Sequence, residues 1–366
     1  MVSKLARLIN LSIEKNIPFV SFKLPDARSV HTWVQISGRI FFSESITQTG
    51  ADSGFVYAPF HRRTNCPVVV FKPEWIFENE DIPEHVFERM ESLPAAGNKT
   101  SRNMPLQISK EEYLSQADGL VKLIGPDLKK VVLSRVQLID RSPEFNEGVF
   151  FLNLIENYPG TFSHIIHIPG AGTWTGASPE TLLRMDGKQV LIQSLAGTKA
   201  KTSREIPWEK KEKEEQQIVT DYIIRVLNRY RIEPFHIDGP TTIEAGNALH
   251  LTTSVSFESR FIRNRLFEFL EALHPTPAVC GVPKEEALEA ILGSEKHNRE
   301  YYSGYCGLLN MHGRTDLFVN LRCMKLVDPS FALFSGGGIT ADSVAESEWQ
   351  ETELKNRLLL SVIQKF

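Results

Sequence analysis

Charged side chains recur at helical spacing in two segments of this 366-residue chain. Glu348, Glu351 and Lys355 fall at positions i, i+3 and i+7, so a helix would place all three on one face. Glu212 and Glu215 lie one turn apart at the start of another helical pattern, and Glu215 shares its face with an apolar stripe. A carboxylate that faces a core needs a compensating cation. From spacing alone, a solvated charge at a helix N-terminus is the better explanation for Glu215, and an exposed Glu–Lys pair is the alternative for the other segment.

A triple glycine and two strand cations offer sites for anions. Gly336, Gly337 and Gly338 follow an apolar strand and can turn backbone N–H groups toward one point, although a simple turn is the commoner explanation. Arg322 alternates with Asn320 along an expected strand and suits a bidentate carboxylate, or equally a solvated edge. Lys130 begins another expected strand, where a lone lysine is usually exposed.

Composition excludes several classes of function. The chain has 41 Lys and Arg against 45 Asp and Glu, so no field of one sign would attract nucleic acid or an anionic membrane. It contains no apolar stretch of membrane-spanning length and no secretory signal pattern. The four cysteines lack metal-site spacing and fit buried thiols in a reducing cytoplasm. Patterns typical of serine hydrolases, zinc proteases, P-loop proteins and dinucleotide-binding proteins are absent.

The elements that must carry these residues are hairpins with intervening helices. Helices are expected at 208–230, 263–273, 284–292 and 346–364, with another from a capping box at Ser109 to Leu123. Strands are expected at 130–138, 181–185, 189–193, 317–326 and 331–334. This pattern favours an α+β fold with mostly antiparallel sheets. The best candidate break between segments is Leu93–Leu106, which is rich in Pro, Gly, Asn, Ser and Thr.

Seven short blocks in this order resemble the chorismate-utilising enzymes, whose members include isochorismate, salicylate, anthranilate and aminodeoxychorismate synthases. The blocks are KVVLSR (130–135), GASPE (176–180), SLAGT (194–198), LHPTPAVCG (273–281), NLRCMKL (320–326), SGGGIT (335–340) and EWQET (348–352) followed by Lys355. The resemblance implies one large α+β domain in which two antiparallel sheets are sandwiched and helices pack outside. Residues 106–366 would form the chorismate-binding catalytic region, and residues 1–105 would complete the fold.

The same resemblance gives the candidate residues their expected roles. Mg²⁺ would be held by Glu215 and Glu351, with Glu212 and Glu348 in or near its ligand shell. Lys130 would be the base that activates water, and Glu180 the acid on the opposite face of the ring, so Lys130 must be neutral and Glu180 protonated. Substrate carboxylates and the ring would be bound by Arg322, Lys355, Gly336, Gly337, Gly338, Gly197, His250, Ala278, Val279 and Tyr302.

Three positions favour isochorismate synthase within this family. Lys130 occupies a position where anthranilate synthases tend to have Gln. Ala196 replaces the lysine nucleophile of aminodeoxychorismate synthases, and Val279 replaces the Thr that salicylate synthases tend to have. Gln216 departs from the family, which commonly has His after the metal-binding Glu.

The expected activity is therefore Mg²⁺-dependent isomerisation of chorismate to isochorismate by a cytoplasmic enzyme, for menaquinone or catechol siderophore biosynthesis. The expected partner is this small substrate alone, without nucleic acid or membrane, and a monomer is the default. Two alternatives remain: an ammonia-dependent anthranilate synthase component I, and a non-catalytic chorismate-binding subunit.

Overall fold

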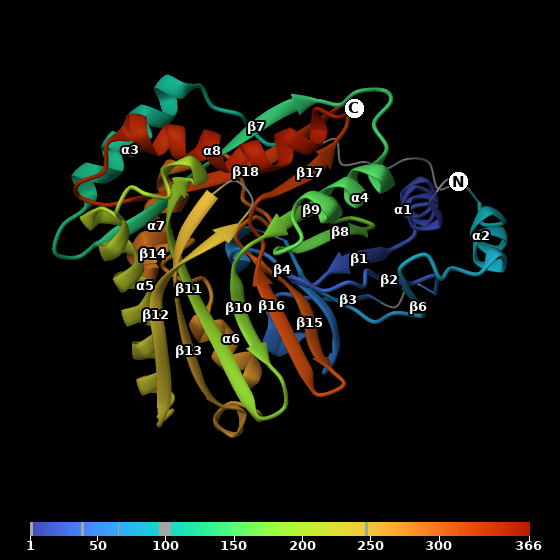
Figure 1. The fold of residues 1–366 in the computed structure, drawn as a ribbon, viewed down its shortest axis with the longest axis horizontal. Coiled ribbons are helices and arrows are strands. Elements are labelled where there is room, and N and C mark those ends of the chain that lie inside the picture. Colours follow the sequence, from blue (N-terminus) through green and yellow to red (C-terminus); the bar gives the residue numbers. More distant parts are fainter. Residues whose placement is uncertain (1–2, 38–39, 65, 95–103, 246–247) are drawn as a thin grey trace.

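Two nine-stranded sheets form the centre of the protein, which we describe from a computed structural model (Figure 1). The structure describes residues 3–37, 40–64, 66–94, 104–245 and 248–366. In spatial order, the first sheet contains β14 (Gly281–Val282), β7 (Lys130–Asp140), β18 (Ser330–Ile339), β17 (Cys323–Val327), β9 (Gly172–Ser178), β8 (Phe162–Ile168), β1 (Phe19–Lys23), β2 (His31–Val34) and β6 (Trp75–Glu78). The second contains β12 (Phe235–Ala245), β13 (Ala248–Glu258), β11 (Gln189–Ala200), β10 (Thr181–Met185), β16 (Arg314–Val319), β15 (Tyr305–Met311), β4 (Gly54–Ala58), β5 (Val68–Phe71) and β3 (Ile40–Ser43).

The two sheets pack against each other, and the recorded strand pairs are antiparallel, as in β7 with β18 and β11 with β13. Between the sheets, Phe162 of β8 stacks on Phe318 of β16 with ring centroids 4.2 Å apart. Such buried aromatic contacts supply much of the apolar area that holds a sandwich together. The expected α+β fold with two sandwiched antiparallel sheets is confirmed.

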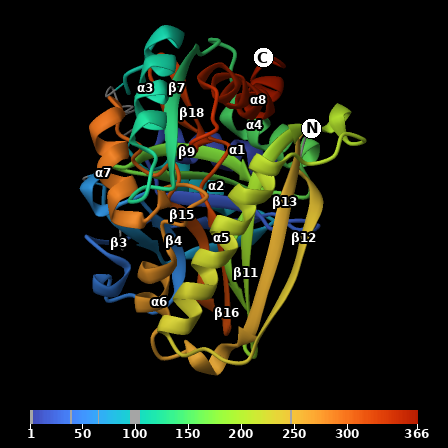
Figure 2. The same cartoon turned by 90° about the vertical axis from the view of Figure 1, so that its left-hand side faces the viewer.

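Helices cover the outside of this sandwich. They are α1 (Lys4–Glu14), α2 (Glu84–Glu91), α3 (Lys110–Leu123), α4 (Glu147–Asn157), α5 (Lys210–Arg229), α6 (Leu266–Leu273), α7 (Lys284–Ser294) and α8 (Ala345–Ile363). Figure 2 shows α5 running along the sheet beside β11 and β13, and α8 packs on β18. In the part of the chain that the structure describes, no helix is both long and apolar enough to cross a bilayer.

The expected helices are present with small shifts at their ends. Ser109 caps α3, and its hydroxyl oxygen accepts a hydrogen bond from the backbone N–H of Glu112 at 3.2 Å, as the capping box predicts. The helix expected from residue 263 begins only at Leu266, because Ser259–Phe261 forms a separate turn of 3₁₀ helix. Most of the expected break at Leu93–Leu106 lies outside the described residues.

The N-terminal third contributes strands to both sheets. β1, β2 and β6 extend the first sheet from β8, whereas β4, β5 and β3 extend the second from β15. Each sheet would therefore lose three strands without residues 1–105, and would expose β8 or β15 as a new edge.

The prediction of one strand over residues 317–326 is wrong. β16 ends at Val319 in the second sheet, and β17 begins at Cys323 in the first. Arg322, between them, has a φ of 49°. Both strands are apolar because both lie in the core. The apolar pattern therefore continues without interruption from β16 into β17, and it gives no sign that one strand ends and another begins. The expected alternation of Asn320 and Arg322 along one strand face therefore does not exist.

A second crossing lies beside the first. The chain leaves the first sheet at the end of β9 and enters the second at the start of β10, with Pro179 and Glu180 between them. Hydrogen bonds tie the two crossings together. The Val319 N–H donates to the Glu180 carbonyl at 3.0 Å, and the Ala177 N–H donates to the Arg322 carbonyl at 3.1 Å. Glu180 and Arg322 thus occupy the joint between the sheets.

Candidate active site

One cavity at this joint collects nearly all the residues singled out by the sequence. It is lined by Lys130, Val132, Pro179, Glu180, Leu195, Ala196, Gly197, Glu215, His250, Ala278, Val279, Tyr302, Ser303, Leu321, Arg322, Phe334, Ser335, Gly336, Gly337, Gly338, Glu351 and Lys355. Of the expected site residues, Glu212 and Glu348 alone are not in the lining. Both sheets and the helices α5 and α8 contribute, so the cavity exists only in the complete sandwich.

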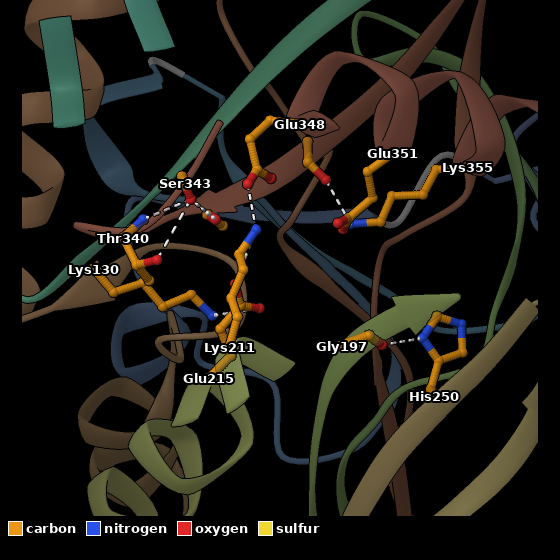
Figure 3. Close-up of polar contacts among 12 residues, drawn as sticks. Lys130, Gly197, Lys211, Glu215, His250, Thr340, Ser343, Glu348, Glu351 and Lys355 are labelled. Atoms are coloured by element: carbon orange, nitrogen blue, oxygen red, sulfur yellow. Dashed lines mark hydrogen bonds and ion pairs between the residues drawn. The ribbon is translucent and has the colours of Figure 1, made fainter. Parts of the chain in front are cut away.

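Lys130 is buried, contrary to the usual exposure of a lone lysine at a strand start. Its side chain is 2% exposed, and its Nζ lies 3.9 Å from Oε2 of Glu215. Gly338 on the neighbouring strand makes this position possible, since a Cβ atom there would lie 2.8 Å from Lys130 Cε. Figure 3 shows the amine pointing toward Glu215. The amine therefore faces the cavity with little access to bulk water.

Glu180 is a buried acid in the same cavity. Only 2% of the residue is exposed, and burial raises the pKa of its carboxyl group to about 8. The positive charges of Lys355 and Arg322, and that of Lys130 whenever its amine is protonated, oppose that rise without overcoming it. At neutral pH this carboxyl group holds its proton and can donate it.

Two helices bring carboxylates and lysines close together (Figure 3), and Glu215, Glu351 and Lys355 among them line the cavity. In α8, Oε1 of Glu351 forms an ion pair with Nζ of Lys355 at 2.6 Å. The same Nζ donates a hydrogen bond to the Gly336 carbonyl at 2.7 Å. From α5, Lys211 pairs with Glu348 and lies 3.9 Å from Oε1 of Glu215. The mixed charges explain how several acids share a buried space.

These acids differ in how readily they ionise. Burial raises the pKa values of Glu215 and Glu348, although nearby lysines counteract the shift. For Glu351 burial acts the same way, but the adjacent Lys355 prevails and holds the pKa below its ordinary value. Oε2 of Glu348 and Oε2 of Glu212 are buried and have no hydrogen-bond partner among the residues that the structure describes. Buried unpaired carboxylate oxygens are free to bind a cation.

Arg322 and His250 form a second polar group in the lining. His250 Nδ1 lies 2.9 Å from the Gly197 carbonyl, which can only accept, so Nδ1 carries the proton. Its Nε2 lies 3.4 Å from Nη2 of Arg322 and accepts from that guanidinium. Burial lowers the pKa of His250 to about 3, so the ring is neutral. Burial also lowers the pKa of Arg322, to about 10, which leaves it charged at neutral pH.

The three glycines do not form the expected turn. They lie in β18, paired with Ser134, Leu133 and Val132 of β7, and none has a positive φ. Their missing side chains make room for neighbours instead. A Cβ at Gly336 would lie 3.0 Å from the Tyr302 hydroxyl, and one at Gly337 would lie 3.0 Å from Oε2 of Glu348. The expected concavity of converging N–H groups is therefore replaced by a flat strand that large polar side chains approach closely.

Lys211 is the charged residue that sequence reasoning missed. It was part of a run of lysines and glutamates at the start of α5 that looked solvated. Its spacing of four from Glu215 was the available signal, because those positions share a helix face. Several lining residues were also missed, among them Val132, Ser303 and Ser335, since apolar residues and serines in strands carry no distinctive pattern.

Gln216 points away from the cavity. Its amide nitrogen donates to the Ser194 hydroxyl at 2.7 Å and to the Thr253 hydroxyl at 2.9 Å, which joins α5 to β11 and β13. The departure from the family's usual His therefore lies in helix–sheet packing.

Known proteins resemble this chain in sequence and in fold. The family described as "Chorismate binding enzyme" matches residues 72–364. Isochorismate synthase EntC of Escherichia coli K12 is 30% identical over 286 residues, which cover 75% of this chain and 71% of EntC. The structure of DhbC from Bacillus anthracis, assigned as a 2,3-dihydroxybenzoate-specific isochorismate synthase, superimposes with a TM-score of 0.78 at 25% identity, covering 98% of this chain and all of that one.

A second solved structure shares the fold at lower identity. MenF of Escherichia coli, a menaquinone-specific isochorismate synthase, superimposes with a TM-score of 0.76 at 19% identity and covers 97% of this chain and 91% of its own. Fold, cavity and sequence similarity together define the class of protein. This chain belongs to the chorismate-binding enzyme family.

Proposed function

We propose that this protein is an isochorismate synthase that isomerises chorismate with the help of Mg²⁺. The observation that carries the proposal is the pairing of a buried amine, Lys130, with a buried protonated acid, Glu180, in one cavity. Addition of water to one ring carbon and loss of hydroxide from another needs a base and an acid at the same time.

The reaction exchanges one carbon–oxygen bond for another. Lys130 removes a proton from water, whose oxygen forms a bond to C2 of the ring. The double bonds shift, the C4–oxygen bond breaks, and Glu180 protonates the departing hydroxyl so that it leaves as water. Neither a redox change nor a covalent enzyme intermediate is needed. The pKa of about 8 at Glu180 suits this role, because an acid must still hold its proton at working pH.

The carboxylates of α5 and α8 suit Mg²⁺. Among the described residues, no group of three or more His, Cys, Asp or Glu side chains is arranged as a metal cage. Mg²⁺ commonly takes one or two protein carboxylates and completes its shell with water and substrate oxygens. We assign these ligands to Glu215 and Glu351, which line the cavity, with Glu212 and Glu348 and their unpartnered buried oxygens beside them. When bound, Mg²⁺ would neutralise the ring carboxylate.

The remaining polar residues orient the substrate. Arg322 and Lys355 are the cations placed to hold carboxylates, and neutral His250 fixes the Arg322 guanidinium through their 3.4 Å contact. Ala278, Val279, Tyr302 and Gly197 line the space for the ring, bounded by Gly336, Gly337 and Gly338. Residues 106–366 thus supply the site, and residues 1–105 complete the sheets.

The choice of isochorismate synthase over its relatives rests on residue types in this lining. Ala196 lies in the cavity and offers no amine for a covalent intermediate. Val279 is apolar and 2% exposed, which fits a reaction that stops before pyruvate is lost. We further propose that the enzyme works in the cytoplasm as a monomer, on a small substrate alone. The four free cysteines fit a reducing compartment.

Product analysis tests the proposal directly. The purified protein is incubated with chorismate, with and without Mg²⁺, and isochorismate, salicylate and anthranilate are separated by chromatography. We expect isochorismate only with Mg²⁺. Lys130→Gln and Glu180→Gln should each lose at least about a hundredfold in kcat, the usual share of a general acid or base. Anthranilate formed with ammonium, or chorismate binding without any product, would instead support the two alternatives.

A further inference from the structure

A buried ion pair lies directly behind the wall of the cavity and takes no part in the proposed chemistry. Glu295 follows the last residue of α7, and Arg299 lies four residues later in the loop before β15. Their side chains are 3% and 2% exposed. Arg299 Nε donates to Oε2 of Glu295 at 2.8 Å, and Nη2 donates to Oε1 at 2.5 Å. This is the two-pronged geometry in which a guanidinium binds a carboxylate most rigidly.

The other guanidinium donors of Arg299 reach two segments of the cavity wall. Nη1 donates to the Val279 carbonyl at 2.8 Å, and Nη2 donates to the Val132 carbonyl at 2.7 Å. Val279 belongs to the loop expected to contact the ring, whereas Val132 lies two residues from Lys130 on β7. One planar group therefore spans the strand that carries the base and the loop that faces the substrate.

Glu295 binds the same edge of this strand two residues further along, at Ser134. Its Oε1 accepts hydrogen bonds from the Ser134 N–H at 2.7 Å and from the Ser134 hydroxyl at 2.8 Å. The Ser134 hydroxyl also lies 3.0 Å from Nε2 of His297. Burial alone would raise the pKa of Glu295, but Arg299 and the serine hold it below its ordinary value. The guanidinium pKa of Arg299 is raised by the same carboxylate despite burial, so each partner favours the ionised form of the other.

We propose that the Glu295–Arg299 pair is a positioning element for the proposed reaction, setting the separation between Lys130 and the Val279 loop. A buried pair of this kind often adds little net stability compared with apolar packing. Its directional hydrogen bonds to the backbone at Val132, Val279 and Ser134 instead fix those segments relative to one another. Within the described part of the chain, the Arg299 side chain donates to Glu295 and to the Val132 and Val279 carbonyls, so its effect on turnover runs through these wall segments. The inference rests on the proposed function, since it concerns the placement of that reaction's base.

The test compares Arg299→Lys with Arg184→Lys. Arg184 forms an Arg–carboxylate pair with buried Asp316, at 2.7 Å, in the second sheet, and neither residue lines the cavity. For Arg299→Lys we expect kcat to fall about 10- to 100-fold, because a small misplacement of reacting groups has effects of that size. KM for chorismate and Kd for Mg²⁺, measured by calorimetry, should stay within about threefold, since Arg322, Lys355 and the metal ligands keep their contacts. Arg184→Lys should keep its kcat.

Wild-type turnover is measured first. If the wild-type protein forms no isochorismate, the proposed function is wrong. If it does form isochorismate, the variants test the role of the ion pair separately from the proposed function. The positioning role is overturned if Arg299→Lys keeps wild-type kcat, or if Arg184→Lys loses as much kcat for an equal drop in melting temperature. If Arg299→Lys does not fold, the variant Ser134→Ala tests the positioning role in its place. It removes one bond to Glu295, and an unchanged kcat in that variant overturns the proposal as well.

Discussion

Glu180 is a residue whose environment predicts a measurable pH dependence of stability. Its folded-state pKa of about 8 lies above the ordinary carboxyl value of 4.5. Between those values the unfolded chain has lost the proton while the folded protein keeps it, so this group makes stability fall as pH rises. Below pH 4.5 both states are protonated, and above about pH 8 both are ionised, so the effect is confined to the window between.

Replacing Glu180 with Gln should remove that dependence. We expect the free energy of unfolding of Glu180→Gln, relative to wild type, to increase by at least about 1 kcal/mol between pH 5 and pH 8. Urea denaturation of the metal-free proteins at these pH values would measure it. Parallel pH profiles for the two proteins would contradict the assignment of a buried, protonated Glu180.

The position of Lys211 predicts how tightly the proposed Mg²⁺ would bind. Its ammonium group pairs with Glu348 and lies 3.9 Å from Glu215, so it already neutralises part of the carboxylate cluster. Lys211→Met keeps much of the side-chain bulk and removes the charge. We expect Mg²⁺ to bind about tenfold more tightly, a gain of about 1.4 kcal/mol, because the cation no longer competes with an internal charge.

Calorimetric titration of Mg²⁺ into both proteins measures this difference. Lys210→Met is the matched control, since Lys210 pairs with Glu214 on the exposed side of the same helix turn and its side chain is 84% exposed. Weaker Mg²⁺ binding by Lys211→Met would mean that Lys211 organises the carboxylates rather than competing for them.

At the scale of secondary-structure elements, the close approach of Lys130 to Gly338 in β18 leads to a prediction. Gly338→Ala would place a Cβ 2.8 Å from Lys130 Cε and 3.3 Å from Oε1 of Glu215. We expect kcat to fall about 100-fold while the fold persists, because the flexible lysine end must move out of place. Gly293→Ala is the control, since a Cβ there meets nothing within 4 Å in α7 and should stabilise the helix by about 0.5–1 kcal/mol. Full activity of Gly338→Ala would show that Lys130 tolerates the shift.

The sequence predicted elements well where periodicity and caps agree, as in α3 with its Ser109 cap and in α5 and α8. It failed where neighbouring segments are buried on both faces. The crossing at Arg322 contains no Gly or Pro, and the apolar pattern continues through it. The sequence therefore carried no signal from which the end of β16 and the start of β17 could be predicted. For the glycines of β18 the error was reversed, because a turn was expected where the strand is continuous. Turn chemistry is their commonest use, but here close approach of Lys130 and Glu348 requires them.

The site was predicted mainly through short blocks of sequence, and its electrostatics was not. Spacing alone favoured solvated surfaces for Glu215 and exposure for Lys130, yet these side chains are 11% and 2% exposed. Burial of a charge depends on which distant segments pack over it, here α5, β7 and β18, and that information is tertiary. Lys211 was missed for the same reason.

At the scale of the whole molecule, the N-terminal strands predict that residues 106–366 do not fold alone. Removing residues 1–105 would remove β1 and β4 and leave their hydrogen-bonding partners β8 and β15 as unpaired sheet edges. We expect the truncated chain to be insoluble or to lack a cooperative thermal transition by circular dichroism. A truncated protein that is monomeric and melts cooperatively would contradict this.

The two neighbouring crossings between the sheets also predict how the enzyme loses activity when it is heated. Pro179–Glu180 and Asn320–Arg322 are short connections, and they carry the expected acid and an expected carboxylate anchor. Hydrogen bonds join Glu180 to Val319 and Arg322 to Ala177, so each connection is held by a strand next to the other. A slight slippage of one sheet over the other would separate these two side chains while leaving every strand intact. Catalytic inactivation by mild heating should therefore precede loss of the β-sheet signal, and it should reverse on cooling.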